Sequence, residues 1–141
     1  MRYLLDTNIC IYIIKRSPPE LYARFRRLKV GDVGVSAITF CELQYGVARS
    51  TRPEKNQPAL TEFLAPLEVL DFPAAAAVNF GEIRYFLQAA GTPIGGYDLL
   101  IAAHALYEGL TLVTNNTREF SRVPGLRLEN WVRPAGTAGR K

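Results

Sequence analysis

The sequence has few of the residues that build disulfide frameworks or zinc sites. Among its 141 residues are two cysteines and one histidine, and they do not stand at a spacing typical of metal ligands. Cys10 and Cys41 lie in apolar surroundings, which indicates buried free thiols in a reducing compartment. His104 lies in an alanine-rich segment, where a packed, hydrogen-bonded imidazole is the usual role. The sequence therefore gives no support to a disulfide scaffold, a zinc site, or Ser–His or Cys–His catalysis.

Long apolar runs are missing as well. No run approaches the ~20 residues that a membrane-spanning helix needs. Asp6 and Asn8 interrupt the short apolar start of the chain, and no cleavage site of small residues follows. We therefore expect a soluble, cytoplasmic protein that does not associate with membranes.

The composition is that of an ordinary globular domain. Hydrophobic residues make up 48% and charged residues 21% of the chain, and its 141 residues suffice for one domain with a proper core. We assign residues 1–132 to that domain and predict a disordered tail at 133–141. The net charge of +4 fits a polyanionic substrate, although many small proteins carry a similar charge.

Short apolar segments alternate with helical patterns along the chain. Strands are predicted at residues 3–5, 33–36, 67–72, 111–114 and 126–129. Helices are predicted at residues 8–15, 21–29, 40–48, 59–65, 74–90 and 97–107, and a short one follows residue 116. The polar stretch 49–58 is expected to be an exposed loop or helix end. Strands that alternate with helices indicate an α/β fold with a mostly parallel sheet, covered by helices on both faces.

Four acidic residues lie where an apolar segment meets a turn or a helix. They are Asp6, Glu42, Asp98 and Glu119. The strands of one open parallel sheet end on a common edge, where such folds bind ligands, so these carboxylates can converge there. Converging carboxylates repel one another unless protons or cations neutralise them. A cluster of hard oxygen ligands indicates Mg²⁺ or Mn²⁺, and that chemistry serves phosphodiester hydrolysis.

Each of these carboxylates also has a simpler explanation. Asp6 can cap the helix that follows it, although an Asp after a buried strand usually points into the cleft. Glu42 has apolar neighbours and needs a partner, either a metal or a cationic side chain. Asp98 can be a first-turn charge at a helix N-terminus, worth only ~0.3–1 kcal/mol. Glu119 can likewise be a first-turn charge at a helix N-terminus. In that case Asn116 would supply the oxygen ligand, and the sequence does not show which of the two residues is the ligand.

Further residues are candidates for supporting roles. Glu82, on the predicted helix 74–90, is a candidate additional acid. Five arginines can contact a nucleic-acid backbone, with solvated faces as the ordinary alternative: Arg24, Arg27, Arg49, Arg52 and Arg118. Three tyrosines can stack on unpaired bases, but core packing explains them equally well: Tyr45, Tyr85 and Tyr97.

Four fragments of the sequence together resemble one known family. They are LLDTN at 4–8, SAITFCELQYG at 36–46, GTPIGGYDLLIAAHA at 91–105 and LVTNNTREF at 112–120. In this order and spacing they are similar to the PIN-domain ribonucleases and, within them, to the VapC toxins of bacterial toxin–antitoxin pairs. Each fragment alone is a weak signal, whereas the four in order are a strong one. The resemblance covers nearly the whole chain, from Tyr3 to Trp131.

The resemblance implies a three-layer α/β/α sandwich and a metal-dependent endoribonuclease that cleaves single-stranded or loop RNA and inhibits translation. It places Asp6, Glu42 and Asp98 at the family's three acidic motif positions, with Mg²⁺ or Mn²⁺ as cofactor. The fourth position is often Asp but here is Glu119, one methylene longer, so we expect it to reach the metal through water.

The resemblance also implies partners. They are an RNA substrate, a second copy of the chain, and a VapB-type antitoxin whose carboxyl-terminal segment blocks the site. Through the antitoxin, the pair can form a larger assembly on DNA.

In-line hydrolysis is the mechanism we expect. The carboxylates would hold the metal, which lowers the pKa of a bound water and stabilises charge on the phosphate. Four polar residues would orient the ligands and the water: Thr7, Asn8, Thr114 and Asn116.

Other functions have less support from the sequence. Phosphatases of the aspartyl-phosphate type place a second Asp two residues after the first, where this chain has Asn8, and no downstream Lys has a matching context. A non-catalytic PIN-like module that binds RNA or protein should have lost an acidic residue, and this chain keeps all four. A DNA nuclease stays open, because phosphodiester chemistry alone does not distinguish the two sugars.

Overall fold

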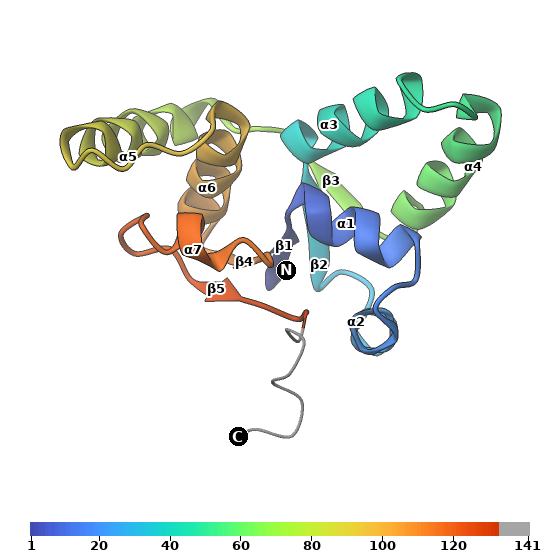
Figure 1. The fold of residues 1–141 in the computed structure, drawn as a ribbon. Coiled ribbons are helices and arrows are strands. Elements are labelled where there is room, and N and C mark those ends of the chain that lie inside the picture. Colours follow the sequence, from blue (N-terminus) through green and yellow to red (C-terminus); the bar gives the residue numbers. More distant parts are fainter. Residues whose placement is uncertain (133–141) are drawn as a thin grey trace.

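The centre of the protein is a parallel β-sheet, seen in a computed structural model that describes residues 1–132 (Figure 1). These residues contribute five strands: β1 (Tyr3–Leu5), β2 (Val33–Ser36), β3 (Glu68–Leu70), β4 (Thr111–Val113) and β5 (Leu128–Glu129). Every neighbouring pair is parallel. The predicted α/β fold is therefore confirmed, although two strands are shorter than the predicted 67–72 and 126–129. The predicted tail at 133–141 lies outside the described residues.

The strand order reverses beside β1. The spatial order is β3-β2-β1-β4-β5, so the chain moves outward from β1 through β2 and β3 and then continues on the other side. In open parallel sheets, ligands bind beyond the carboxyl ends of the strands at such a reversal. The residues that follow β1 and β4 therefore lie at the expected binding edge.

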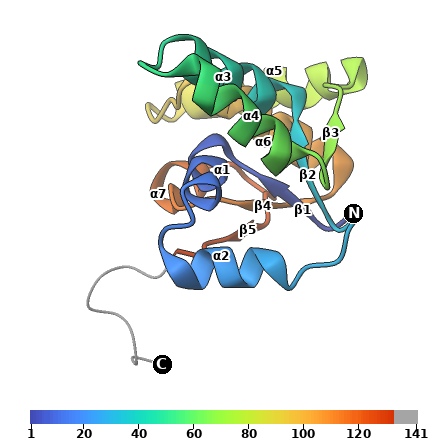
Figure 2. The same ribbon diagram turned by 90° about the vertical axis from the view of Figure 1, so that its right-hand side faces the viewer.

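Helices cover both faces of the sheet, as Figures 1 and 2 show. They are α1 (Thr7–Ile14), α2 (Pro19–Arg26), α3 (Ala37–Ala48), α4 (Pro53–Leu64), the 3₁₀ turn η1 (Ala74–Ala76), α5 (Ala77–Ala89), α6 (Gly96–Glu108) and α7 (Thr117–Phe120). One buried core joins the sheet to α5 and α6, and a second joins it to α1, α2, α3 and α4. This arrangement is an α/β/α sandwich. Within residues 1–132, no helix combines the length and the apolarity needed to cross a bilayer.

The alternating side chains of the strands explain the two cores. Leu4 and Leu112 belong to the core under α5 and α6, whereas Tyr3, Leu5 and Val113 belong to the core on the opposite face. Successive residues of a strand point to opposite faces of the sheet. Because both faces are covered, the strands appear in the sequence as continuous apolar runs. For this reason the apolar pattern located β1 and β4 to within one residue.

The polar stretch 49–58 is where the sequence-based prediction was in part wrong. Helix α4 begins at Pro53, six residues before the predicted start at 59. Proline is favourable at the first position of a helix, and the residues after it are polar because they are exposed. Pro58 lies inside α4, at the loss of one backbone hydrogen bond.

Two smaller corrections concern α3. Ser36 caps this helix by accepting a hydrogen bond from the backbone N–H of Ile38 at 3.1 Å, so α3 begins at Ala37 and not at residue 40. Cys10 is buried as expected, but Cys41 is exposed. An apolar neighbourhood in the sequence does not reveal which face of a helix a residue occupies.

Candidate active site

Asp6 follows β1 directly and begins α1. Its Oδ1 accepts a hydrogen bond from the backbone N–H of Ile9 at 2.9 Å, so the predicted cap is real. The Thr114 hydroxyl also donates to Asp6, and Thr114 Oγ1 accepts a hydrogen bond from the backbone N–H of Asn116 at 2.9 Å. Only 5% of Asp6 is exposed. This burial is the main cause that raises the pKa of Asp6 from 3.8 to about 6.

Glu42 reaches the same edge of the sheet from α3. Thr7, the first residue of α1, donates its hydroxyl hydrogen to Glu42 Oε1 at 2.5 Å. Hydrogen bonds to an ionised carboxylate are short and stronger than those between neutral groups. The bond spans 35 positions of sequence and ties α3 to the start of α1, which fixes one of the two carboxylate oxygens.

Asp98 lies in the first turn of α6. This helix buries Leu99 and the run 101–105 in the core, so the backbone that carries Asp98 is held by packing. Burial raises the pKa of Asp98 from 3.8 to about 6, and the charges of Glu42 and Glu119 act in the same direction. Asp98 therefore lies close enough to both residues to respond to their charges.

Glu119 lies in α7, just beyond β4. The side-chain amide of Asn116 donates a hydrogen bond to Glu119 Oε1 at 2.7 Å. In the structure Asn116 thus holds Glu119, and it is the Glu119 charge that acts on Asp98. A chain of hydrogen bonds runs from Asp6 through Thr114 and Asn116 to Glu119.

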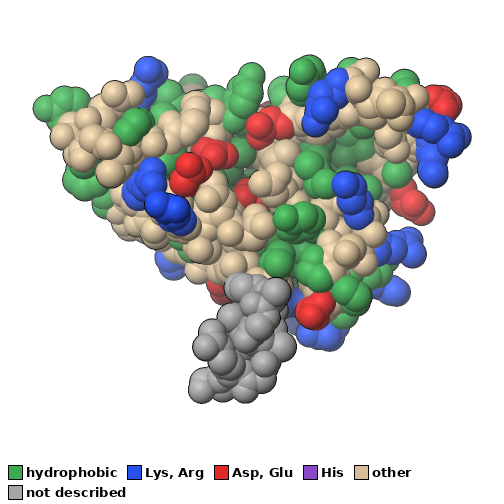
Figure 3. Space-filling view, viewed as in Figure 1, with side chains coloured by type: hydrophobic (Ala, Val, Ile, Leu, Met, Phe, Trp, Pro, Cys, Tyr) green, Lys and Arg blue, Asp and Glu red, His purple; other side chains and the backbone are tan. Residues whose placement is uncertain are grey.

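Within residues 1–132, the four carboxylates converge without forming an ion pair. Asp98 and Glu42 raise the pKa of Asp6, just as Glu42 and Glu119 raise that of Asp98. The ion pairs within residues 1–132 involve other carboxylates. Figure 3 shows acidic side chains near the middle of this face, with basic side chains to either side. Like charges in partly buried surroundings favour bound protons or a bound cation.

The donor set suits a hard cation. Carboxylate oxygens are the ligands that Mg²⁺ and Mn²⁺ prefer. Within residues 1–132, no three Asp, Glu, His or Cys side chains already stand in an arrangement that could hold a metal ion. Glu42 is held by Thr7, and Glu119 by Asn116. The residue types that bind such a cation are therefore present at this edge of the sheet.

Two predicted site residues are not drawn into this cluster. Glu82 is exposed on α5 and is not among the charges that act on Asp6 or Asp98. Asn8 is exposed on α1, and within residues 1–132 its side chain makes no hydrogen bond.

The five arginines considered for the nucleic-acid backbone have different surroundings. Arg24 pairs with Glu129 at 3.0 Å, and Arg52 pairs with Glu54 at 3.3 Å. Each of these two charges is therefore partly balanced by an ion pair at the protein surface. The other three form no ion pair within residues 1–132: Arg27, Arg49 and Arg118. Of these, Arg49 lines two grooves together with Glu42, and Arg118 directly precedes Glu119 in α7.

One link between the site helices was missed by the sequence analysis. His104 Nδ1 lies 2.8 Å from Ser36 Oγ, and both residues are fully buried. Since Ser36 caps α3 and His104 belongs to α6, this bond ties the helix of Glu42 to the helix of Asp98. Burial lowers the pKa of His104, which keeps the imidazole neutral at pH 7. The hydrogen-bonded role expected for His104 is confirmed, but no local pattern could identify a partner 68 positions away.

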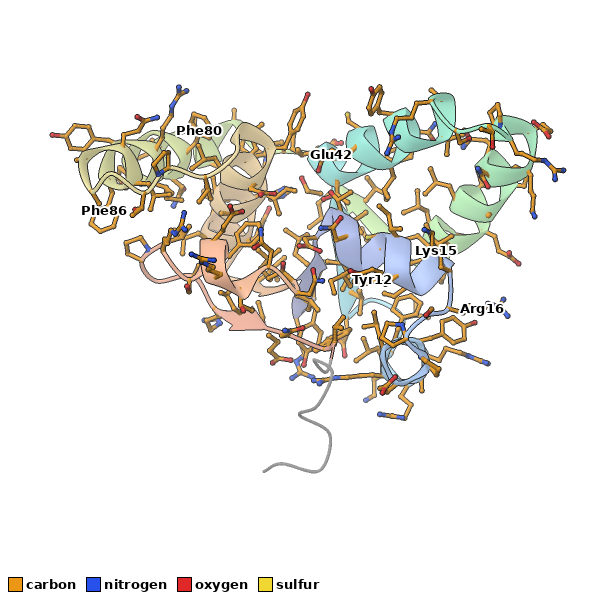
Figure 4. The ribbon with its side chains drawn as sticks, viewed as in Figure 1. Tyr12, Lys15, Arg16, Glu42, Phe80 and Phe86 are labelled. Carbon is orange, nitrogen blue, oxygen red and sulfur yellow. The ribbon has the colours of Figure 1, made fainter. Side chains whose placement is uncertain are left out.

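Two grooves meet at Glu42. One, which we call the tyrosine groove, has a volume of about 420 Å³, and its lining includes Thr7, Cys41, Glu42, Tyr45, Arg49 and Tyr97. The other, which we call the apolar groove, has a volume of about 390 Å³, and its lining includes Ile14, Lys15, Glu42, Leu43, Val47 and Leu60. Figure 4 shows Glu42 on α3 and Lys15 on the neighbouring α1. A molecule in either groove would lie beside the Glu42 carboxylate.

The chain is similar to known proteins in sequence and in fold. The PIN domain family matches residues 3–126. Ribonuclease VapC2 of Rickettsia felis is 48% identical over 132 residues, which are 93% of this chain and 98% of the relative. The tRNA(fMet)-specific endonuclease VapC of Salmonella typhimurium is 46% identical over 131 residues, 93% of this chain and 98% of the relative. The crystal structure of VapBC2 from Rickettsia felis bound to a promoter DNA fragment contains a chain with a TM-score of 0.88 and 47% identity, and the match covers 94% of this chain and 100% of that one.

Proposed function

Because the chain belongs to the PIN-domain family, we propose that it is a metal-dependent endoribonuclease, the toxin of a VapBC-type toxin–antitoxin pair. The observation that carries the proposal is the convergence of Asp6, Glu42, Asp98 and Glu119 beside the reversal of strand order. Within residues 1–132 none of these four carboxylates forms an ion pair. Unpaired carboxylates repel a phosphodiester, so the site would act on one only when a cation lies between them.

The carboxylates have distinct parts in this proposal. Asp6, Glu42 and Asp98 would hold Mg²⁺ or Mn²⁺, and Glu119 would reach it through water. When bound, the metal lowers the pKa of a water molecule and stabilises charge on the phosphate. Asp6 and Asp98 would bind it in their ionised forms, so metal affinity should fall as the pH drops below about 6.

The hydrogen bonds around the carboxylates restrict their motion before the substrate arrives. The Thr7 hydroxyl holds Glu42, and the Asn116 amide holds Glu119. Thr114 is fully buried, and its Oγ1 accepts a hydrogen bond from the backbone N–H of Asn116, which supports the segment that carries Asn116. Such supporting contacts orient metal ligands and preserve the geometry that the reaction needs.

We propose RNA with an unpaired segment as the substrate, and transfer RNA as the first candidate. The relative from Salmonella typhimurium is named as a tRNA(fMet)-specific endonuclease. Cleavage of a transfer RNA would inhibit translation. The net charge of +4 favours a polyanion, and Arg49 and Arg118 would contact phosphates near Glu42 and Glu119.

We propose that the apolar groove holds the carboxyl-terminal segment of a VapB-type antitoxin. The similar chain from Rickettsia felis was solved in a VapBC2 complex on promoter DNA. Ile14, Leu43 and Leu60 give the groove aliphatic walls, and Glu42 lines it as well. A segment that lies there would reach the carboxylates and block them, and the rest of the antitoxin would carry the pair onto DNA.

We propose a homodimer in which a second copy of the chain covers α5. Val78, Tyr85 and Phe86 on this helix are 66%, 78% and 50% exposed, and Figure 4 shows Phe86 at the edge of the molecule, away from Glu42. Large apolar side chains that are exposed together mark an interaction surface. The RNA substrate and the exposed free thiol of Cys41 fit a cytoplasmic setting.

The test of the nuclease proposal is cleavage of labelled RNAs by purified, antitoxin-free protein. The panel contains transfer RNAs, ribosomal fragments, messages and single-stranded DNA, each with Mg²⁺, Mn²⁺ or EDTA. We expect cleavage of an RNA that requires the metal. Asp6→Asn and Asp98→Asn should each slow it at least 100-fold, a loss on the order of 3 kcal/mol of transition-state stabilisation. Glu82→Gln is the matched control and should retain native activity.

Cleavage that persists in EDTA, or in both Asn variants, would contradict the proposal. RNA binding without cleavage by the folded native protein would instead favour a non-catalytic binding module. Cleavage of the DNA alone would assign the site to a DNA nuclease.

A further inference from the structure

Tyr45 and Tyr97 accompany the carboxylates of the site. Tyr45 follows Glu42 by three residues on α3, so the two side chains lie on one side of the helix. Tyr97 directly precedes Asp98 in the first turn of α6. Tyr45 is 68% exposed and Tyr97 is 63% exposed. The sequence left core packing open for these tyrosines, and their exposure excludes it.

The tyrosine groove brings the two rings to one place. Its lining joins Tyr45 of α3 and Tyr97 of α6 with Glu42. Arg49 lines the same groove, and its guanidinium carbon lies 5.8 Å from the centre of the Tyr45 ring. The volume of about 420 Å³ falls within the range of small-molecule sites. The groove therefore combines exposed aromatic rings, a cation and a carboxylate of the active site.

These features fit an unpaired nucleobase better than a protein segment. Aromatic side chains stack on every base, because every base has a π-face. The Arg49 charge at the Tyr45 ring complements a negatively charged backbone. The apolar groove is different, since aliphatic side chains such as Leu43 and Val47 line it. Glu42, a proposed metal ligand, lines the tyrosine groove. A base in this groove would therefore lie next to the phosphate that reacts at the metal.

We propose that the tyrosine groove binds one unpaired base of the RNA beside the scissile phosphate. Tyr45 and Tyr97 are its stacking surfaces, and Arg49 contacts the adjacent phosphate. This inference rests on the proposed ribonuclease function and names the form of substrate that the site accepts. A base inside a duplex is stacked between its neighbours and cannot enter the groove. Stacking uses the flat face of a base and not its hydrogen-bonding edges. The groove therefore requires that the base is unpaired, and it does not distinguish one base from another.

The test combines tyrosine variants with RNAs that lack single bases. Tyr45→Leu and Tyr97→Leu remove the aromatic ring, whereas the two Phe variants keep it. Tyr107→Leu is the matched control, because Tyr107 is 46% exposed at the other end of α6 and does not line the groove. The substrates are one cleaved single-stranded RNA and a series in which each position in turn carries an abasic ribose. The kcat and KM of cleavage are measured for every pair.

We expect both Leu variants to raise KM about 5- to 50-fold with little change in kcat, which corresponds to the loss of one stacked base. The Phe variants keep the stacking ring and should recover most of the affinity that the Leu variants lose, whereas Tyr107→Leu should behave like the native protein. An abasic ribose beside the cleaved bond should raise KM of the native protein by a similar factor. It should have no further effect in the Leu variants, because the base and its stacking surface form one interaction.

Equal abasic penalties in the native protein and the Leu variants would overturn the proposal. Unchanged RNA affinity together with weaker inhibition by the antitoxin would also overturn it, because that result assigns the groove to the antitoxin. Light scattering of each variant controls for a change in oligomeric state.

The base site and the nuclease function can fail separately. If the native protein cleaves no RNA, fluorescence anisotropy with the same abasic series measures binding directly. A retained dependence of binding on one abasic position, lost in Tyr45→Leu, would support the base site without nuclease activity. Cleavage that is intact but shows no such dependence would overturn the base site alone.

Discussion

Helices α3 and α6 each carry a carboxylate of the site and an exposed tyrosine beside it, but they are held in different ways. α6 buries Leu99 and the run 101–105, whereas α3 buries only Thr39 and Leu43. Glu42 on α3 instead receives a hydrogen bond from Thr7. Packing therefore positions Asp98, and hydrogen bonds at the edge of the sheet position Glu42.

The weaker burial of α3 follows from its place in the molecule. Both grooves run along this helix and share Glu42 and Arg49 in their lining. A helix whose residues line grooves on two sides cannot also be covered by the core on those sides. Substitutions of the buried residues of α6 should therefore affect stability most, and substitutions of the residues of α3 that line the grooves should mainly affect cleavage or binding.

The largest effect on stability is expected from a cavity under α6. Ile101 is fully buried, and Ile101→Ala should lower the free energy of unfolding by about 3 kcal/mol. Leu43→Ala on α3 should cost roughly half as much, because Leu43 lines the apolar groove and the gap opens to solvent. Urea unfolding of both variants measures the difference. Equal losses would show that α3 is held by packing as firmly as α6.

The next effect is the dependence of stability on pH. The pKa of Asp6 is about 6 in the folded protein, compared with 3.8 for an unperturbed Asp side chain. The folded state therefore binds the Asp6 proton more tightly than the unfolded state does. The stabilisation is complete below about pH 4 and is lost as the pH rises through about 6. The native protein should thus lose up to about 3 kcal/mol more stability than Asp6→Asn over this range.

Chemical unfolding in EDTA at several pH values checks this expectation. Asp98→Asn should change the pH dependence in the same direction, and by less, because Asp98 is only half-buried. Parallel stability curves for the native protein and Asp6→Asn would contradict the prediction.

A smaller effect is expected where a hydrogen bond replaces packing. Thr7→Val removes the donor to Glu42 Oε1 and should slow cleavage about 10-fold, the equivalent of roughly 1.5 kcal/mol for a bond to a charged group. Thr7→Ser keeps the hydroxyl and should restore most of the rate. The measurement is kcat for the native protein and the two variants. If Thr7→Val were as active as the native protein, the Thr7 hydrogen bond would not be what positions Glu42.

The smallest effect concerns two helical glycines. At Gly46 on α3 and at Gly81 on α5, an added methyl group would meet no atom within 4 Å. Each Gly→Ala substitution should therefore stabilise the protein by ~0.5–1 kcal/mol through helix propensity. Gly46 lines both grooves, so Gly46→Ala should also weaken RNA and antitoxin binding, which Gly81→Ala should leave unchanged. Thermal unfolding and binding titrations of the two variants separate these effects.

Much of the fold could be predicted from the sequence because local patterns encode it. The apolar runs that form β1 and β4 are properties of neighbouring residues. The polar start of α4 was missed because an exposed helix beginning at Pro53 resembles a loop in composition. Cys41 was misplaced because its apolar neighbours lie on other faces of α3.

The candidate site was predictable in its membership more than in its arrangement. Asp6, Glu42, Asp98 and Glu119 could be named because each lies where an apolar segment of the sequence meets a turn or a predicted helix. Glu82 is also a carboxylate, but it is exposed on α5 and is not among the charges that shift the pKa of Asp6 or Asp98.

The sequence by itself determined the order of strands and helices, the parallel sheet and the acidic residues at its edge, because apolar periodicity and turn residues act over a few positions. Only the tertiary structure decided that Thr7 holds Glu42, that His104 joins the two site helices, and that Tyr45 and Tyr97 lie exposed in one groove. These facts depend on contacts between residues far apart in the chain, and such contacts exist only after both cores have packed.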